Sequence, residues 1–98
     1  MSVNLTDTYD STLLQVSVEF GHLEATKILV ERGAVINYTN NHCNRPLMLA
    51  AYCGKLETFR YLTETGADIN ICDDGNYTAL HYAAKTCSVN IIKLLLDK

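Results

Sequence analysis

Apolar and polar residues recur along this chain with a period of 33 residues, and no gap interrupts the period. Two columns hold leucine in every unit, and a third holds a glycine followed by an alanine. These columns are Leu14/Leu47/Leu80, Leu29/Leu62/Leu95 and Gly33-Ala34/Gly66-Ala67. A fixed period of this length is typical of stacked repeats, in which one unit cannot bury its apolar face alone.

Each unit is predicted to form two helices separated by a tight turn. In the third unit Thr78 stands where a helix N-cap belongs, and residues 80–84 follow with apolar helical spacing. In the first unit Thr12 and Gln15 have the spacing of a capping box. The second helices are expected to begin at equivalent residues, near Leu23, Leu56 and Val89.

Glycines mark the two places in a unit where a helix ends. Gly21 and Gly54 separate the first helix from the second, and Gly33 and Gly66 follow the second helix. We expect positive φ at these residues, because glycine adopts left-handed backbone without a Cβ penalty. Cys87 replaces the first of these glycines in the third unit, which predicts that the turn there is either strained or differently shaped.

Three stretches of the chain resemble ankyrin repeats: residues 78–84 (TALHYAA), 66–70 (GADIN) and 54–57 (GKLE). They are similar to the family's TPLHxAA, GADVN and GHLE motifs, in one register over residues 4–98. The resemblance implies an all-α fold, an ankyrin-repeat solenoid of stacked helix–turn–helix units joined by loops like β-hairpins. It implies one domain at 1–98, with repeats at about 7–39, 40–72 and 73–98, the last one truncated.

The resemblance also implies a function, because ankyrin repeats as a family bind other proteins. Partners dock on the concave face that hairpin tips and first helices form. Carried onto this chain, the candidate partner-binding residues are Tyr9, Phe20, Asn41, His42, Asn44, Tyr52, Asp74, Tyr77 and Lys85. Aromatic residues are favoured interface anchors, although each could instead pack against a neighbouring hairpin. The alternative is that the chain is the ankyrin segment of a larger enzyme, channel or effector whose activity lies elsewhere.

Composition and charge argue against other classes of function. The formal net charge of −3 provides no basic field for nucleic acid, and no apolar run is long enough to span a membrane. No phosphate-binding loop, metalloprotease motif or nucleophile elbow is present, so we expect neither an enzyme nor a cofactor. The polar N-terminal residues do not resemble a signal peptide, and we expect an intracellular, cytoplasmic location.

The four cysteines are predicted to be free thiols in a reducing compartment. They are Cys43, Cys53, Cys72 and Cys87, and no two have the Cys-x-x-Cys spacing of a zinc ribbon or a redox motif. We therefore expect no metal. A metal site built from His42, Cys43 and Cys72 is the less favoured alternative.

The last predicted helix is apolar on more than one side. A terminal repeat should instead have a polar outer face, because nothing covers it. The apolar residues are Ile91, Ile92, Leu94, Leu95 and Leu96. This pattern predicts either that the natural stack continues in a longer chain or that the C-terminal repeat associates with itself.

Overall fold

The computed structural model describes residues 12–37, 46–70, 72 and 75–97 of the 98-residue chain. The helices in these ranges are α1 (Leu13–Glu19), α2 (Leu23–Glu31), α3 (Pro46–Cys53), α4 (Leu56–Glu64), α5 (Ala79–Lys85) and α6 (Val89–Leu96). The described ranges contain no strand, and the predicted all-α solenoid is confirmed.

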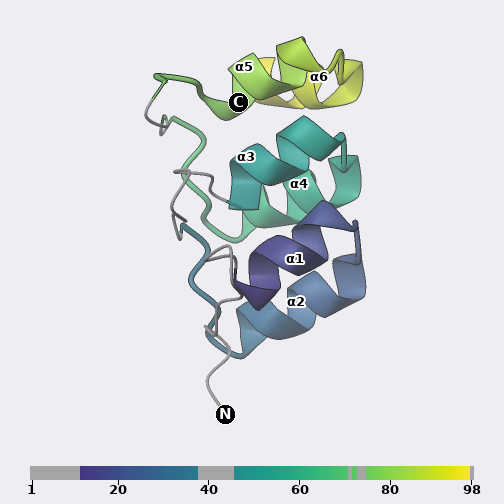
Figure 1. Cartoon of the computed structure of the whole chain (residues 1–98), viewed down its shortest axis with the longest axis vertical. Helices are drawn as coiled ribbons and strands as arrows, with labels where there is room; N and C mark the ends of the chain where they lie inside the picture. Colours follow the sequence, from purple (N-terminus) through teal and green to yellow (C-terminus); the bar gives the residue numbers. More distant parts are fainter. Residues whose placement is uncertain (1–11, 38–45, 71, 73–74, 98) are drawn as a thin grey trace.

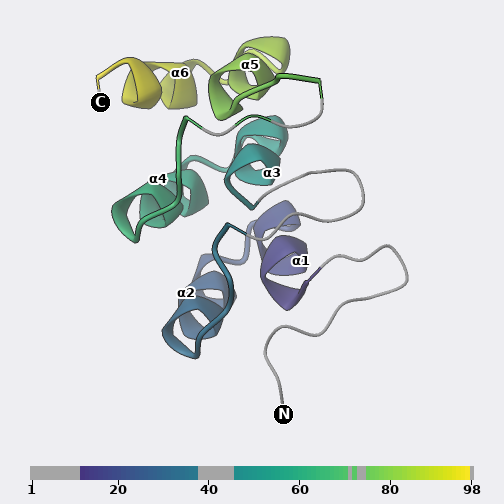
Figure 2. The ribbon, with the colours of Figure 1, turned by 90° about the vertical axis from the view of Figure 1, so that its left-hand side faces the viewer.

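The helices form two layers along the stack (Figure 1). The first helices pack side by side, α1 against α3 and α3 against α5, while α2 packs against α4 and α4 against α6 (Figure 2). Each first helix also packs against the second helix of its own unit. The described residues therefore form a stack of three helix pairs.

Local signals place the helix ends where the sequence predicts them. The backbone N–H of Gln15 donates to Thr12 Oγ1 at 3.2 Å, and Thr12 N–H donates to Gln15 Oε1 at 3.0 Å. In the third pair His81 N–H donates to Thr78 Oγ1 at 3.5 Å and Thr78 N–H donates to His81 Nδ1 at 3.0 Å, so both predicted caps are confirmed. Helix α3 begins at Pro46, whose fixed φ suits the first helical turn.

The turn between the two helices of a unit has the same backbone in all three pairs. Gly21 and Gly54 have φ of 72° and 69°, and Cys87 has φ of 58°. A residue with a Cβ pays roughly 1–2 kcal/mol for this left-handed conformation. Of the two alternatives predicted at Cys87, the structure shows the strained turn and not a differently shaped one. Positive φ at Gly33 and Gly66 is confirmed.

The hydrophobic core fills the space between the two layers and between successive pairs. Its fully buried members include Leu14, Val18, Ala50, Ala51, Phe59, Leu62 and Ala83. The alanines allow first helices to approach closely, because a larger side chain would force them apart. The core is therefore shared by neighbouring repeats, and no repeat has a core of its own.

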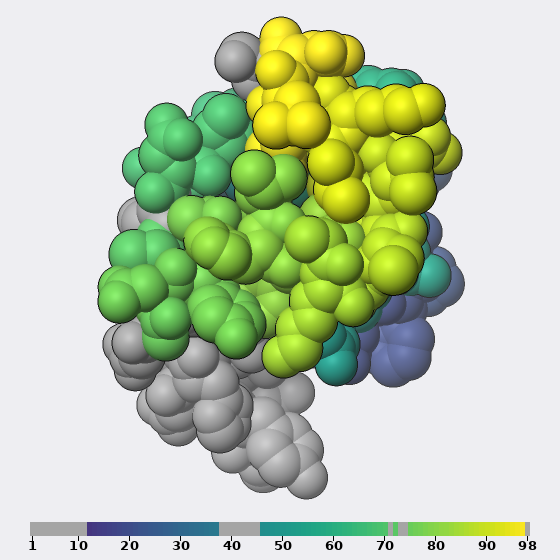
Figure 3. All heavy atoms as spheres, turned by 90° about the horizontal axis from the view of Figure 1, so that it is seen from above, coloured from purple at the N-terminus to yellow at the C-terminus, as the bar shows by residue number. Residues whose placement is uncertain are grey.

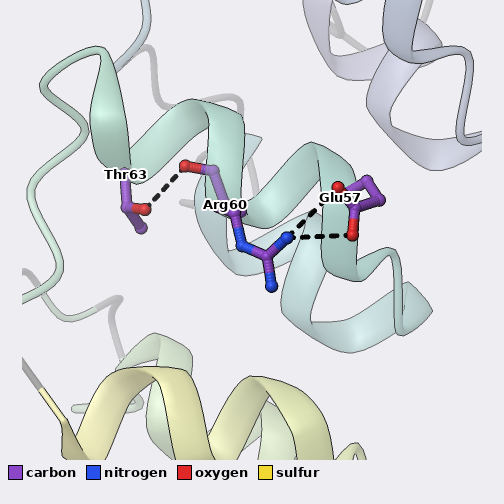
Figure 4. A network of polar contacts seen from close by, with 3 residues as sticks. All are labelled: Glu57, Arg60 and Thr63. Carbon is purple, nitrogen blue, oxygen red and sulfur yellow. Dashed lines mark hydrogen bonds and ion pairs between the residues drawn. The ribbon is translucent and has the colours of Figure 1, made fainter.

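Polar contacts supplement this packing. Asp68 N–H donates to Asn37 Oδ1 at 3.2 Å across a repeat boundary. On the exposed side of α4, Arg60 pairs with Glu57 at 3.1 Å, and Thr63 donates to the Arg60 carbonyl at 2.8 Å (Figure 4). None of the described helices is long and apolar enough to cross a membrane.

Candidate partner-binding site

Three tyrosines from two repeats gather on the exposed side of α3 and α5. The ring centroid of Tyr82 lies 6.0 Å from that of Tyr52 and 5.5 Å from that of Tyr77. The interplanar angles are 86° and 68°, so both contacts are edge to face, a favoured geometry for aromatic pairs. We call Tyr52, Tyr77 and Tyr82 the tyrosine surface.

Two residues of α5 hold the ring of Tyr77 in place. His81 stacks on it with centroids 5.5 Å apart and an interplanar angle of 17°. Lys85 Nζ lies 5.5 Å from the ring centroid, in cation–π geometry. Because His81 Nδ1 already accepts from Thr78, the imidazole is itself oriented. The rings of the tyrosine surface are therefore ordered, and the positive charge of Lys85 lies beside them.

A hollow of about 270 Å³ opens next to these rings, between α3 and α5. Met48, Leu49, Tyr52 and Tyr82 line it. Ligand pockets for small molecules typically measure about 300–1,000 Å³, and this hollow lies just below that range. An apolar lining at this size suits one side chain of a partner protein better than a whole cofactor.

The structure brings three of the predicted partner-binding residues together. Tyr52 and Tyr77 both contact Tyr82, and Lys85 contacts Tyr77. Phe20 is exposed at the end of α1, where it stacks on His22 with centroids 6.4 Å apart. The other predicted residues, Tyr9, Asn41, His42, Asn44 and Asp74, lie outside the described residues.

Sequence reasoning missed the residue at the centre of the tyrosine surface. Tyr82 lies inside the TALHYAA motif, and a motif residue is easily assigned to the core. One signal could have identified it. Residues three apart share a helix face, so Tyr82 lies on the same side of α5 as Lys85. Leu49, which also lines the hollow, has no comparable signal, because the equivalent residues Val16 and Tyr82 are apolar or aromatic as well.

One cysteine of α3, Cys53, has a shifted pKa. Burial raises the pKa of the Cys53 thiol, and the Glu19 carboxylate raises it further, against a smaller opposing effect of Lys55. The thiol is therefore protonated at neutral pH and is a poor nucleophile.

The described cysteines Cys53, Cys72 and Cys87 are free thiols, as predicted. In the part of the chain that the structure describes, no group of three His, Cys, Asp or Glu residues could hold a metal. The alternative site at His42, Cys43 and Cys72 falls largely outside that part.

Comparison with known proteins adds one finding to this geometry. A family model described as "Ankyrin repeats (3 copies)" matches residues 1–73 and 40–98. The two matches overlap and together cover the chain. No curated protein matches the chain.

Proposed function

Since the chain belongs to the ankyrin repeat family, we propose that it binds a partner protein through the concave face formed by hairpin tips and first helices. Ankyrin repeats are in general protein–protein interaction modules. The observation that carries the proposal is the tyrosine surface beside the hollow between α3 and α5. The partner places an apolar side chain in this hollow.

The energetics of the tyrosine surface support this role. Tyr52 and Tyr77 are 52% and 40% exposed, although each contributes a large apolar ring. Tyrosine is enriched among residues that dominate binding energy, and such residues cluster around pockets. Because the rings already contact one another, binding has little side-chain entropy to remove. The exposed rings can therefore contribute affinity at a small ordering cost.

We propose that binding is the activity of this chain and that it catalyses no reaction. Two observations support this view. The raised pKa of the Cys53 thiol makes it a poor nucleophile, and His81 Nδ1 already accepts a hydrogen bond from Thr78 N–H. The free thiols of Cys53, Cys72 and Cys87 support an intracellular location, because reducing compartments keep thiols reduced.

The proposal is tested by affinity capture with the 98-residue chain and a Tyr52→Ala/Tyr77→Ala double variant. Quantitative mass spectrometry compares the proteins that each bait retains. We expect the double variant to lose a specific partner by about tenfold or more, since truncated hot spots cost about 2 kcal/mol or more each. Its melting temperature should change little, because both rings are partly exposed.

A control variant shows whether the effect comes from losing the tyrosine surface or from removing any tyrosine side chain. Tyr61→Ala removes one tyrosine side chain from α4 in the second-helix layer, where Lys27 Nζ lies 5.8 Å from the Tyr61 ring centroid. This variant should capture the partner as the wild type does. Equal capture by all three baits, or unfolding of the double variant, would overturn the proposed function.

A further inference from the structure

The last helix pair of the stack exposes residues whose equivalents are buried inside it. Leu47 is 3% exposed, whereas Leu80 in the same column is 37% exposed. Val18 and Ala51 are fully buried, whereas Ala84 is exposed. Helix α3 covers these positions of α1, and α5 covers those of α3, but no described helix covers α5.

Four apolar residues are exposed on the last helix pair. We call this set the C-terminal end face, and it comprises Leu80, Ala84, Val89 and Leu96. Figure 3 looks onto this end of the stack, where the yellow-green and yellow atoms of α5 and α6 face the viewer. The equivalents of Val89 in the other repeats, Leu23 and Leu56, are half-buried. Large apolar side chains exposed together at one end of a stack are candidates for an interaction site.

The opposite end of the stack also exposes residues whose equivalents in the other repeats are covered. Leu13, Ala25 and Ile28 are exposed there and form the N-terminal end face. With Val16 and Leu29 they line an apolar groove of about 390 Å³ between α1 and α2. Their equivalents in the later repeats are buried or half-buried: Pro46 and Ala79, Thr58 and Ile91, and Tyr61 and Leu94.

We infer that a second copy of this chain docks head to tail, with its N-terminal end face on the C-terminal end face of the first copy. The interior of the stack shows what covers each face. Inside the stack, the residues of α1 and α3 that face the following repeat are covered by residues of α3 and α5 that face the preceding repeat. The N-terminal end face of the first repeat corresponds to the residues that face a preceding repeat, and the C-terminal end face of the third corresponds to those that face a following repeat. Two copies therefore complete the same kind of interface.

The lysine that lies at the boundary between the first two repeats has an equivalent in the head-to-tail contact. Inside the chain, Lys27 Nζ lies 5.8 Å from the ring centroid of Tyr61 in the next repeat. Lys93 occupies the column of Lys27, and Ile28 occupies the column of Tyr61. In the head-to-tail contact, the alkyl stem of Lys93 covers Ile28 of the second copy while its ammonium group remains in water.

This mode of association has a distinctive consequence. A head-to-tail contact leaves one face of each kind unoccupied, so copies add without limit unless the rotation closes a ring. The mean mass should therefore rise past that of a dimer as concentration increases. The tyrosine surface takes no part in the contact, so the inference is independent of the proposed function.

The experiment uses two variants with the same chemical change, Ala25→Glu on the N-terminal end face and Ala84→Glu on the C-terminal end face. Both alanines are exposed and helical, so the separate chains should fold, which circular dichroism verifies. Each glutamate would place an unpaired charge in a close apolar contact. Analytical ultracentrifugation should show each variant monomeric at concentrations at least about tenfold above those at which the wild type associates.

The decisive sample is the mixture of the two variants. Ala25→Glu retains its C-terminal end face and Ala84→Glu retains its N-terminal end face, so an equimolar mixture should form a dimer and stop there. A wild type that is monomeric up to millimolar concentration would overturn the inference. So would a dimer of Ala25→Glu alone, because that result indicates a closed contact between two C-terminal end faces. Loss of association in Tyr52→Ala/Tyr77→Ala would also contradict it.

Discussion

The second and third repeats have the same residue type in the same column and bury it to different extents. Leu47 in α3 is 3% exposed and Leu80 in α5 is 37% exposed, although both follow the first residue of their helix. The difference arises because α5 covers α3, while no described helix covers α5. In a stacked repeat, burial is a property of the neighbour as much as of the residue.

The substitutions between repeats follow the same rule. Met48 is buried in α3, and its equivalent in α5 is the exposed His81, whose Nδ1 accepts from Thr78. The first repeat places Gln15 in this column, and Gln15 is buried. Its Oε1 accepts from Thr12 N–H at 3.0 Å, so the buried amide oxygen has a partner. A polar residue is therefore accommodated in this column either by exposure or by a local hydrogen bond.

The largest expected effect comes from truncating the two leucines separately. Leu47→Ala should reduce the free energy of unfolding by about 2–5 kcal/mol, because it leaves a cavity in a packed core. Leu80→Ala should cost about 1 kcal/mol or less, since partly exposed side chains lose little on truncation. Urea unfolding at low micromolar concentration measures both. Equal losses would show that position in the stack does not determine the contribution of this column.

The sequence could predict most of the fold because its signals act locally. Caps at Thr12 and Thr78 and left-handed turns at Gly21, Gly54 and Cys87 depend on residues within one or two helical turns. The different burial of Leu47 and Leu80 could not be read from their column, because it depends on which helix lies next to each.

The candidate site was predictable to a smaller extent for the same reason. Tyr52, Tyr77 and Lys85 were identified because they lie in variable columns or at a predicted hairpin tip. Tyr82 was not identified, because it lies in the motif that carries the resemblance to the family and not in a variable column. Its contacts with Tyr52 and Tyr77 depend on how α3 and α5 pack, and on the segment that precedes α5. No pattern within one repeat reports that geometry.

A second prediction concerns the turn that the second repeat makes with Gly54 and the third with Cys87. Cys87→Gly should raise the free energy of unfolding by about 1 kcal/mol, because glycine removes the Cβ penalty at φ of 58°. Gly54→Ala is the reciprocal change and should lower stability by about 1 kcal/mol, since φ there is 69°. Thermal unfolding measures both. If both variants were destabilised, the two turns would not be equivalent.

The smallest expected effect concerns a charge pair that the third repeat lacks. Glu24 pairs with Lys27 and Glu57 pairs with Arg60 (Figure 4), whereas Asn90 stands three residues before Lys93. Asn90→Glu should create an i,i+3 pair and place an acid in the first turn of α6, raising stability by about 0.5 kcal/mol.

The control for this change is Asn90→Gln, which adds the same length of side chain without the charge. The gain of Asn90→Glu over Asn90→Gln should largely vanish in 1 M NaCl, where the Debye length is about 3 Å. A gain that survives in salt, or that Asn90→Gln reproduces, would reflect helix propensity instead of charge. The missing carboxylate would then not contribute to the difference between the second and third repeats.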